Sequence, residues 1–445
     1  MFDHSRAQFE DLARSVLDQA ARLGATAAAT DVSESSGLSV NVRKGKVETI
    51  EQTRDKGLGV TVYVGTRRGH ASTSDFGARA VAETVKAAFE IARFTGEDPA
   101  AGLPDPDTLA RGYRDLELFH PWTIEADEAI GIASTMEAAA FDSSPAIVNS
   151  EGAGVSISHG HFLSANSLGF VGGYPYSRHS IACAPIARRG RAMQRDDWYS
   201  AARHPSRLAD PAAVGRYAAQ RALSRLGARK LGSRKVPVLF ESPLACGLLG
   251  HFVQAASGHA LYRKASFLVG ALGTQVFAPH LDLDEDPHQP GEFGSTPFDD
   301  EGVATSARRV VDGGRLDGWF LSTYSARKLG MKTTGNAGGA HALRLSSRRT
   351  RPRDDLVAML RKLGTGLFVT ELLGHGVNGV TGDYSRGASG YWVEDGEIQY
   401  PVEEITIAGN LKEMYAAIAA VGADEVQRGG RRCGSVLIER MAVAG

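Results

Sequence analysis

The sequence predicts an α+β protein, with N-terminal α/β sandwich-like units followed by a large, glycine-rich, mostly antiparallel β C-terminal domain with a few helices. Three observations point to this class. Segments with apolar residues at helical spacing alternate with segments in which every second residue is apolar. Glycine accounts for 52 of the 445 residues, which is well above ordinary usage. Asp-Gly pairs, which favour tight hairpin turns, separate strand-like segments near the C-terminus.

The first predicted unit, an N-terminal α+β domain, covers residues 1–96. Ser5, followed three residues later by Gln8, gives the capping-box pattern of a helix start. Alternation over 36–74 then predicts a three-stranded meander, because alternation places every second side chain on one face of a sheet. The expected elements are a helix over 5–24, strands that turn at Gly45 and Gly57, and a helix over 77–94.

Residues 97–122 are expected to form a linker, because they hold four of the 17 prolines. A central α+β domain over 123–230 follows this linker. It begins with a helical pattern, continues with alternating segments and closes with a second helical pattern. The expected elements are helices over 123–141 and 210–227 and strands over 147–158, 161–170 and 177–188.

The remainder of the chain, 235–445, is expected to form a β-rich C-terminal domain. It holds 30 of the 52 glycines, and nine of these lie between Gly364 and Gly396. Glycine adopts positive φ without strain and lets other backbone approach closely, so this stretch predicts tight turns and accessible main chain. Two helices, over 242–262 and 410–421, are expected to interrupt the strands.

The charge composition excludes a protein that is steered to polyanions. Lys and Arg total 50 and Asp and Glu total 51, so no overall field attracts nucleic acid or an anionic membrane. The three cysteines, Cys183, Cys246 and Cys433, are odd in number and widely spaced, as in a reducing compartment. The uncharged stretch 242–262 contains several polar residues, which favours a buried helix over a membrane span. We therefore expect a cytoplasmic protein with no nucleic-acid and no membrane partner.

Three short motifs match known functional patterns only in part. Gly374 to Gly379 has the glycine spacing of a dinucleotide loop, but the following segment is strand-like rather than helical. The acidic run 282–288 resembles the start of a calcium loop, yet Pro287 stands where such a loop needs glycine. A solvated loop is expected there, and the basic run 346–353 is likewise expected to be an exposed loop.

His159 and His161 lie two residues apart on a predicted strand, so their side chains share one face. Two imidazoles are fewer than the three or four ligands of most zinc sites, although His179 or Cys183 could join them. Structural or surface histidines are the prediction here. An autonomous metallopeptidase that uses an unrecognised site around these residues stays an alternative.

The most informative segment is the predicted helix around His251. A helix-borne metallopeptidase site needs a second histidine about one turn after the first, and a glutamate beside it as the base. In this chain Phe252 follows His251, and Ala255 and Ala256 occupy the positions one turn later. The residues therefore predict no catalytic group and no metal in this chain, and His251 is expected to be buried and hydrogen-bonded.

Several long stretches resemble the PmbA/TldE branch of the TldD/PmbA family, and the resemblance covers nearly the whole chain. These stretches include SVNVRKGKVETIEQTRDKGLGVTVYV, FESPLACGLLGHFVQAASGHALYRKASF, DPHQPGEFGSTPFDDEGV, TGLFVTELLGHGVNGVTGDYSRGASGYWVEDGEIQY and CGSVLIERMAVAG. They are long and occur in the same order as in the family, which makes the resemblance specific.

The resemblance has a direct implication for the metal site. In that family the TldD branch is the metallopeptidase, with HExxxH on a helix completed by a later cysteine. When Gly247 and His251 are aligned with that pattern, its glutamate falls on Phe252 and its second histidine on Ala256. Cys433 lies too close to the C-terminus to match the cysteine ligand. His251 is therefore a vestigial metal-site position, and zinc is expected in a TldD-like partner.

The resemblance also implies a heterodimer that trims or degrades an extended peptide. This chain would then be inactive without its TldD-like partner. The glycine-rich stretch supplies candidate contacts to substrate or partner, with turn and strand-end roles as the alternative: His375, Asn378, Asp383, Tyr384 and Arg386. A non-proteolytic regulator, following the family's older name of modulator of DNA gyrase, is a further alternative, and homodimerisation of the chain alone stays open.

Overall fold

The computed structural model describes residues 2–445, which divide into two compact units. The N-terminal unit is built from the chain up to Leu223 together with two short segments, 290–292 and 297–305. The C-terminal unit consists of the remaining residues. Within the described chain, no helix is both long enough and apolar enough to cross a membrane.

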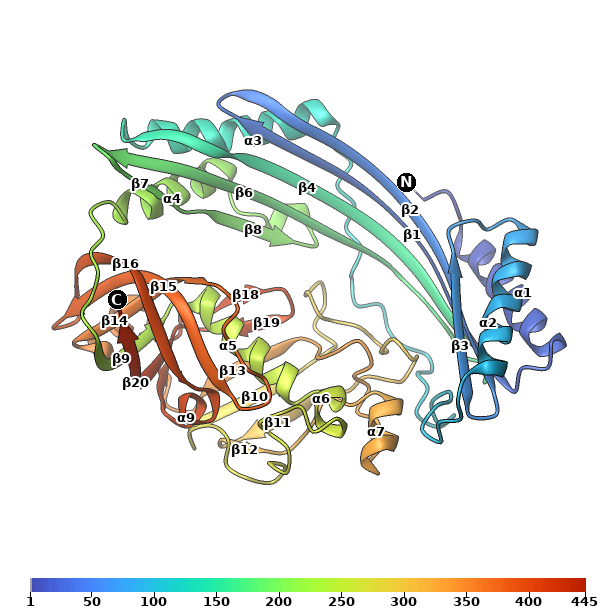
Figure 1. Cartoon of the computed structure of the whole chain (residues 1–445). Helices are drawn as coiled ribbons and strands as arrows, with labels where there is room; N and C mark the ends of the chain where they lie inside the picture. Colours follow the sequence, from blue (N-terminus) through green and yellow to red (C-terminus); the bar gives the residue numbers. More distant parts are fainter. Residues whose placement is uncertain (1) are drawn as a thin grey trace. The chain divides into compact units, whose positions relative to one another are not determined.

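One eight-stranded antiparallel sheet forms the centre of the N-terminal unit. Its main path runs β3-β2-β1-β4-β6-β7, with β5 paired to β4 and β8 paired to β6. The strands are β1 (Ala27–Arg43), β2 (Lys46–Val64), β3 (Arg67–Thr73), β4 (Ile147–Asn166), β5 (Val171–Gly172), β6 (Pro175–Arg189), β7 (Ala192–Arg195) and β8 (Trp198–Ala202). Strands from both predicted N-terminal ranges therefore belong to a single sheet (Figure 1).

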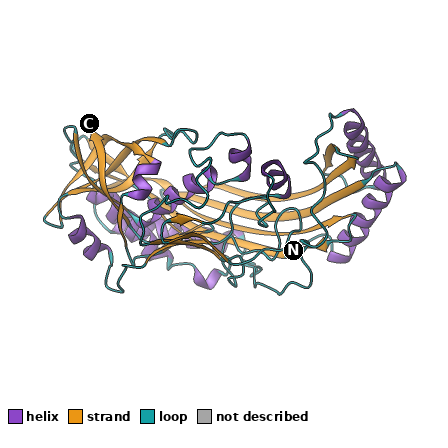
Figure 2. Ribbon diagram, turned by 90° about the horizontal axis from the view of Figure 1, so that it is seen from below, coloured by secondary structure: helices purple, strands orange, loops and turns teal. Residues whose placement is uncertain are grey.

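Helices cover this sheet at its two ends, and the long strands run between them (Figure 2). At one end α1 (Arg6–Arg22) and α2 (Ala78–Phe94) pack on it, and toward the other end α3 (Ala126–Asp142) does so. The first helical layer buries a core that includes Phe9, Val32 and Leu163. A 3-10 turn (Pro205–Arg207) and α4 (Pro211–Ser224) complete the unit.

Two strands are longer than the sequence predicts. The expected turn at Gly57 is wrong, because this residue is paired to Ser33 and β2 continues through it. The predicted turn at Gly45 is confirmed, since Lys44 and Gly45 both have positive φ, and the second turn lies at Gly65. Likewise, β4 joins two segments that were expected to be separate strands. A glycine flanked by paired residues does not need to turn, and composition alone does not reveal that pairing.

The C-terminal unit contains two six-stranded sheets, with orders β12-β11-β10-β13-β19-β18 and β16-β15-β14-β9-β20-β17. All pairings are antiparallel except β13 with β19 and β9 with β14. The strands are β9 (Arg234–Phe240), β10 (Leu281–Glu285), β11 (Arg308–Asp312), β12 (Arg315–Leu316), β13 (Leu343–Ser347), β14 (Gly366–Leu373), β15 (Asp383–Glu394), β16 (Glu397–Asn410), β17 (Ile418–Val421), β18 (Val426–Arg428), β19 (Arg431–Cys433) and β20 (Val436–Ala444). The predicted mixture of α and β with a mostly antiparallel C-terminal domain is confirmed.

Helix α5 (Ser242–Ala255) contacts strands of both of these sheets and packs into the largest core of the chain. The predicted helix over 242–262 breaks after α5, because Ser257 caps a new helix by accepting a hydrogen bond from Ala260 N. The predicted helix over 410–421 also stops early, since Ile418 and Val421 pair with β20 as part of a strand. The remaining helices are α6 (Gly258–Tyr262), α7 (Thr323–Leu329), α8 (Leu356–Leu363) and α9 (Leu411–Ala416).

The acidic run, expected to be a solvated loop, is paired with arginines, and one of these, Arg348, belongs to the basic run, which is an exposed loop over 348–353 as expected. Asp282 lies on β10, is 6% exposed, and accepts hydrogen bonds from the guanidinium of Arg348 at 2.7 and 2.9 Å. Glu285, on the same strand, is 1% exposed. The prediction of a solvated acidic loop was wrong, because its carboxylates are matched by arginines that are distant in sequence and adjacent in the sheet.

Candidate functional site

His251 lies on α5 at the border between the buried and the exposed side of the helix. Gly247 and Gln254, one turn before and one turn after it, are exposed, and His251 itself is half-buried. The opposite side of the helix is buried in the core and includes Ala245, Cys246, Leu248, Leu249, Phe252 and Ala255. Spacing of three and four residues therefore places His251 on the side that faces outward from the core.

The positions that would carry a base and a second ligand are part of the core. Phe252 is fully buried and contacts the ring of Phe277 edge-on, with the ring centroids 5.1 Å apart. Ala256 is also fully buried and ends α5 by donating its backbone N–H to Phe252 O. Neither side chain has an atom that could polarise water or bind a metal ion.

Arg431, at the start of β19, lies against the exposed side of α5. A Cβ atom placed on Gly250 would lie 2.8 Å from Nη1 of Arg431, so the guanidinium rests where a larger residue would stand. The backbone carbonyl of Arg431 also accepts a long hydrogen bond from the Cys246 thiol, at 3.7 Å. Gly250 is therefore the residue of α5 that makes room for this cation.

Strand β15 brings two further side chains to the same helix. Tyr384 and Arg386 are two residues apart on this strand, so both point to the side that packs on α5. The Tyr384 ring lies edge-on to the His251 ring, with centroids 6.0 Å apart. Its buried hydroxyl has no hydrogen-bond partner within residues 2–445. Arg386 donates from Nε to Leu373 O at 3.1 Å.

The environment of His251 is cationic. Burial, together with the positive charges of Arg386 and then Arg431, lowers the pKa of His251 below its ordinary value. The expectation of a hydrogen-bonded histidine was wrong, because the ring contacts Tyr384 and has no hydrogen-bond partner in the described chain. The imidazole is therefore neutral at physiological pH and lies close to two guanidiniums.

Cys433 is buried and chemically inert. Its side chain is fully buried, and its thiol donates to Gly434 O at 3.1 Å. Burial, followed by the neighbouring Cys246 and nearby carboxylates, raises the pKa of Cys433 well above its usual value. Only the thiolate is a good metal ligand, and burial favours the protonated thiol. Cys433 is therefore a packing residue of the core.

The predicted contact residues of the glycine-rich stretch separate into two groups. Asn378 and Asp383 stabilise a turn: the Asn378 side chain accepts from Val380 N, and Asp383 binds Thr381 and Asn410. His375 is exposed in the preceding loop. Tyr384 and Arg386, described above, are the two members of this set that approach His251.

With this geometry in view, three family models match the chain. They are described as PmbA/TldA metallopeptidase domain 1, central domain and C-terminal domain, and they cover residues 30–92, 119–226 and 233–445. The "Metalloprotease PmbA" of Escherichia coli O157:H7 is 47% identical over 93% of this chain and 91% of its own length. The chain belongs to the PmbA/TldD family.

Two solved structures share the fold of this chain. A Bacteroides thetaiotaomicron protein described as a candidate modulator of DNA gyrase matches with a TM-score of 0.93 and 26% identity, covering 99% of both chains. TldE from Thermococcus kodakarensis matches with a TM-score of 0.84 over 98% of this chain and 99% of its own. At 19% identity the second match concerns the fold alone.

The metallopeptidase description of the PmbA/TldD family implies a metal ion, but the residues around His251 do not fit one. Zinc sites use three or four nitrogen, sulfur or oxygen donors. No group of three or more His, Cys, Asp or Glu side chains in residues 2–445 is arranged to hold a metal. The single imidazole also lies in the field of Arg386 and Arg431, and their positive charge opposes a bound cation.

Arg431 is the residue of this site that the sequence did not indicate. It belongs to a short Arg-Arg-Cys segment more than 170 residues after α5, and only the parallel pairing of β19 with β13 brings it to the helix. Gly250 was the one available signal. A glycine inside a helix lowers helix stability, so it indicates a close neighbour without naming it.

The alternative site in the N-terminal unit is only partly assembled. His159 and His161 share a face of β4, and the His159 and His179 rings lie 5.4 Å apart. His161 Nε2 binds Glu34, and His159 Nε2 accepts the backbone N–H of Trp122 at 3.1 Å. Cys183 pairs with Ala153, six residues along β4 from His159, and burial raises its pKa to about 12. The cysteine therefore does not join these histidines.

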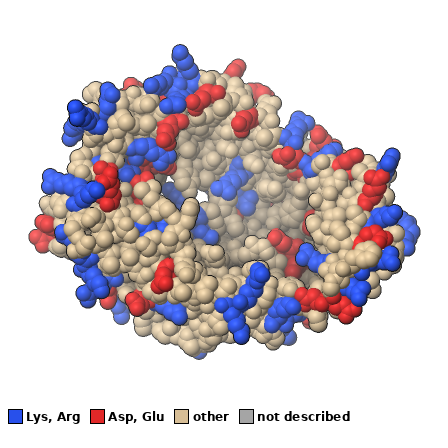
Figure 3. Space-filling view, in the orientation of Figure 1, with Lys and Arg blue, Asp and Glu red and all other residues tan. Residues whose placement is uncertain are grey.

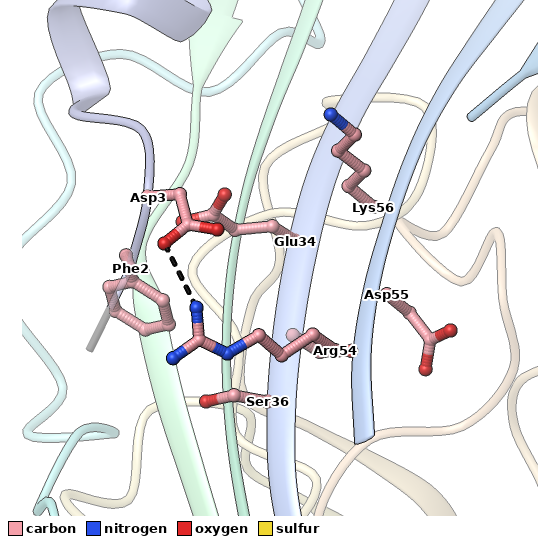
Figure 4. Close-up of a pocket in the computed structure, with 8 residues that line it drawn as sticks. Phe2, Asp3, Glu34, Ser36, Arg54, Asp55 and Lys56 are labelled. Atoms are coloured by element: carbon pink, nitrogen blue, oxygen red, sulfur yellow. Dashed lines mark hydrogen bonds and ion pairs between the residues drawn. The ribbon is translucent and has the colours of Figure 1, made fainter. Parts of the chain in front are cut away.

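A small cavity of about 170 Å³ lies beside Glu34 (Figure 4). Arg54 points across it and forms an ion pair with Asp3 at 3.3 Å, and Asp55 points away on the other side of the strand. Glu34 is held by His4 at 2.7 Å and His161 at 3.0 Å. The charged groups of this cavity are thus largely satisfied by one another.

We expect the N-terminal unit to lose stability as the pH falls from about 6.5 to 4. Burial and then the neighbouring His179 lower the pKa of His159 to about 4, below that of the unfolded chain. The unfolded state therefore binds more protons in this window, and protonation favours it. Replacing His159 with Gln, which can still accept the hydrogen bond from Trp122 N, should flatten the dependence of the thermal midpoint between pH 7.5 and 5.

His375→Gln is the matched control for this experiment, because the same side chain is changed at an exposed position in the other unit. Its profile should follow the wild type. An unaltered profile for His159→Gln would contradict the assignment of the acid sensitivity to this histidine.

Positive and negative side chains are interspersed over the face of the protein drawn in Figure 3. This agrees with the near balance of 50 basic and 51 acidic residues in the sequence. The whole-chain charge therefore does not single out a binding surface. The positive charges that bear on the candidate site are those of Arg386 and Arg431, beside α5.

Proposed function

We propose that this chain is the non-catalytic subunit of a TldD/TldE-type zinc metallopeptidase that cleaves or trims peptides. One observation carries the proposal. Where the TldD pattern has a base and a second histidine ligand, this chain has Phe252 and Ala256, and both are fully buried in the core of the C-terminal unit. A small local rearrangement would not turn these positions into a catalytic site.

In the proposed complex the chemistry belongs to the TldD-like partner. There a metal ion and a glutamate would supply the activated water that attacks a peptide carbonyl. This chain supplies a wall of the peptide chamber and contacts to an extended substrate. Strand β15 lies between β14 and β16, so its main chain is already paired on both sides, and its contacts to a peptide would come from side chains such as Tyr384 and Arg386.

Two alternatives remain, and each has an observation in its favour. The rings of His159 and His179 lie 5.4 Å apart on paired strands of the N-terminal unit, which is the observation that favours an autonomous metallopeptidase, although no group of three or more His, Cys, Asp or Glu side chains in residues 2–445 is arranged to hold a metal. The Bacteroides relative is described as a candidate gyrase modulator, which would suit a regulator without proteolytic activity.

The test is co-expression with a TldD-like partner, followed by a peptide-cleavage assay in which each subunit is omitted in turn. We expect cleavage only when both chains are present. Metal analysis should find zinc in stoichiometric amount in the complex and well below it in this chain alone.

Cleavage by this chain alone would overturn the proposal. His159→Ala and His161→Ala would then show whether the N-terminal histidines carry that activity. Undiminished cleavage by the partner alone would also contradict the proposal, because this chain would then contribute nothing to the reaction.

A further inference from the structure

We propose that Arg386 and Arg431 form a carboxylate-binding site on the exposed side of α5, at the position where the family's metal ligands are lost. The site would bind a carboxylate of an extended peptide. This inference rests on the proposed function for its biological setting, but the site is defined by residues of this chain alone.

The first step is that both guanidiniums lack an anionic partner. Several arginines of this unit pair with carboxylates, as Arg309 does with Asp284 and Arg344 with Glu425. Within residues 2–445, neither Arg386 nor Arg431 forms such an ion pair. Arg386 donates to a single backbone carbonyl, which leaves most of its five N–H groups available.

The second step is that the two cations are held in place. Arg386 is fixed by its hydrogen bond to Leu373 O across the β14–β15 pair. Arg431 is fixed by β19, and its guanidinium lies over the helix at Gly250, where a Cβ would come within 2.8 Å. Arg431 lies against α5 at Gly250, and Arg386 shares a face of β15 with Tyr384, whose ring contacts that of His251 on the same helix. Two cations on one side of a helix favour a bound anion.

The third step is the buried hydroxyl of Tyr384. It is 1% exposed, has no hydrogen-bond partner in the described chain, and lies within the electrostatic reach of Arg386. An unsatisfied buried hydroxyl costs free energy, and in native structures it usually marks a place where a ligand or water completes the network. It is a second, independent sign that this part of the unit is completed by another molecule.

The chemistry of the site indicates the class of ligand. Guanidinium groups bind planar carboxylates through paired hydrogen bonds, and such charge-assisted bonds are about twice as strong as neutral ones. A peptide offers this group either at its C-terminus or on an Asp or Glu side chain. The shared chemistry is the carboxylate, and binding measurements can separate the two sources.

The experiment uses the full-length chain and four unlabelled octapeptides with acetylated N-termini in isothermal titration calorimetry. The peptides share one neutral sequence and differ only in a free or amidated C-terminus and in Glu or Gln at position five. We expect peptides with a carboxylate to bind about tenfold or more tightly than the peptide that has none. The peptide that accounts for this difference identifies the source of the carboxylate.

Substitutions test the residues. Arg431→Gln and Arg386→Gln should each remove most of the preference for carboxylate, and Arg431→Lys should restore part of it. Arg432→Gln is the matched control, because it removes the same charge from the next residue of β19, whose side chain is exposed on the other face. Equal binding of all four peptides, or an equal loss in Arg432→Gln, would overturn the proposal.

Two glycine variants test the geometry without removing a charge. Gly250→Ala should displace the guanidinium of Arg431 and weaken carboxylate binding. Gly247→Ala, one turn earlier on α5, places its Cβ in open space and should leave binding unchanged. A similar affinity for carboxylate in both variants would show that the position of Arg431 over the helix is irrelevant to the site.

A spectroscopic readout keeps this proposal separate from the proposed function. The pKa of His251 can be followed by NMR with ¹³C-labelled histidine. It should rise when a peptide with one carboxylate is bound, either the Glu peptide with an amidated C-terminus or the Gln peptide with a free one. The reason is that the negative charge of the peptide offsets the two arginines. None of these measurements requires cleavage or a partner. If the chain binds carboxylates but does not support cleavage by the partner, the proposed function is wrong and the carboxylate site is retained. If it supports cleavage but shows no preference for carboxylates, only the carboxylate site is wrong.

Discussion

Replacing Glu285 with alanine should destabilise the C-terminal unit by about 3–5 kcal/mol, which is the typical effect of breaking a buried ion pair from one side. The carboxylate is 1% exposed and accepts three hydrogen bonds, from Arg308 Nε at 2.7 Å, Asn336 Nδ2 at 2.9 Å and His341 N at 2.8 Å. Truncation would leave these three donors without their acceptor, and the Arg308 charge would lose its partner.

The measurement is the urea midpoint of the unit, with Asp284→Ala as the control. Asp284 precedes Glu285 on β10 and also pairs with an arginine, Arg309, at 2.8 Å. Its side chain is 41% exposed, so the loss should be at most about 1 kcal/mol. Similar midpoints for the two variants would contradict the role given to the buried network. Glu285→Gln should lie between them, since it keeps one acceptor oxygen.

Gly215→Ala is expected to have the second large effect, lowering the stability of the N-terminal unit by about 2–3 kcal/mol. A Cβ at Gly215 on α4 would lie 1.9 Å from the carbonyl oxygen of Met136 on α3, and the backbone N of Ala140 would be 3.3 Å away. Because both neighbours are backbone atoms, no side-chain rotation relieves the clash and the two helices must separate. For a unit of this size the thermal midpoint should fall by roughly 4–12 °C.

Gly131→Ala gives the matched control for this substitution. Gly131 is also inside a helix, α3, but an added Cβ meets nothing within 4 Å. Alanine favours helix over glycine by about 0.5–1 kcal/mol, so this variant should be slightly more stable than the wild type. The opposite signs of the two changes would separate the packing effect from helix propensity. A stabilising Gly215→Ala would show that the α3–α4 contact is loose.

Local patterns in the sequence predicted those features that depend on nearby residues. Ser5 and Gln8 form the predicted capping box, and the helix α2 occupies the predicted segment. The sequence also predicted that the positions of the base and the second ligand hold Phe252 and Ala256, because helix geometry fixes where these residues lie relative to His251. The family assignment, which rests on long ordered stretches, is confirmed by models that match three segments of the chain.

Features that depend on distant pairing were not predictable. The acidic run was expected to be solvated, since nothing near Asp282 in sequence indicates that Arg348 lies beside it. Gly57 was expected to turn the chain, although its pairing with Ser33 keeps it extended. Arg431 reaches α5 only because β19 joins β13, two strands separated by more than 80 residues. In each case the residue that determines the local structure is a neighbour brought there by strand pairing, and the local sequence does not identify it.

The pairing of β1 with β4 has a consequence for synthesis on the ribosome. Residues Ala29 to Val42 of β1 pair on one side with β2, directly after them in the chain, and on the other side with residues 153–166. At about 5–20 residues per second, the second partner emerges roughly 5–20 s after the first hairpin is complete. During that interval the hairpin has an open edge and an uncovered row of valines, which is a template for pairing with another nascent chain. Fast elongation between these strands, or a chaperone that binds the hairpin, would raise the yield of folded protein.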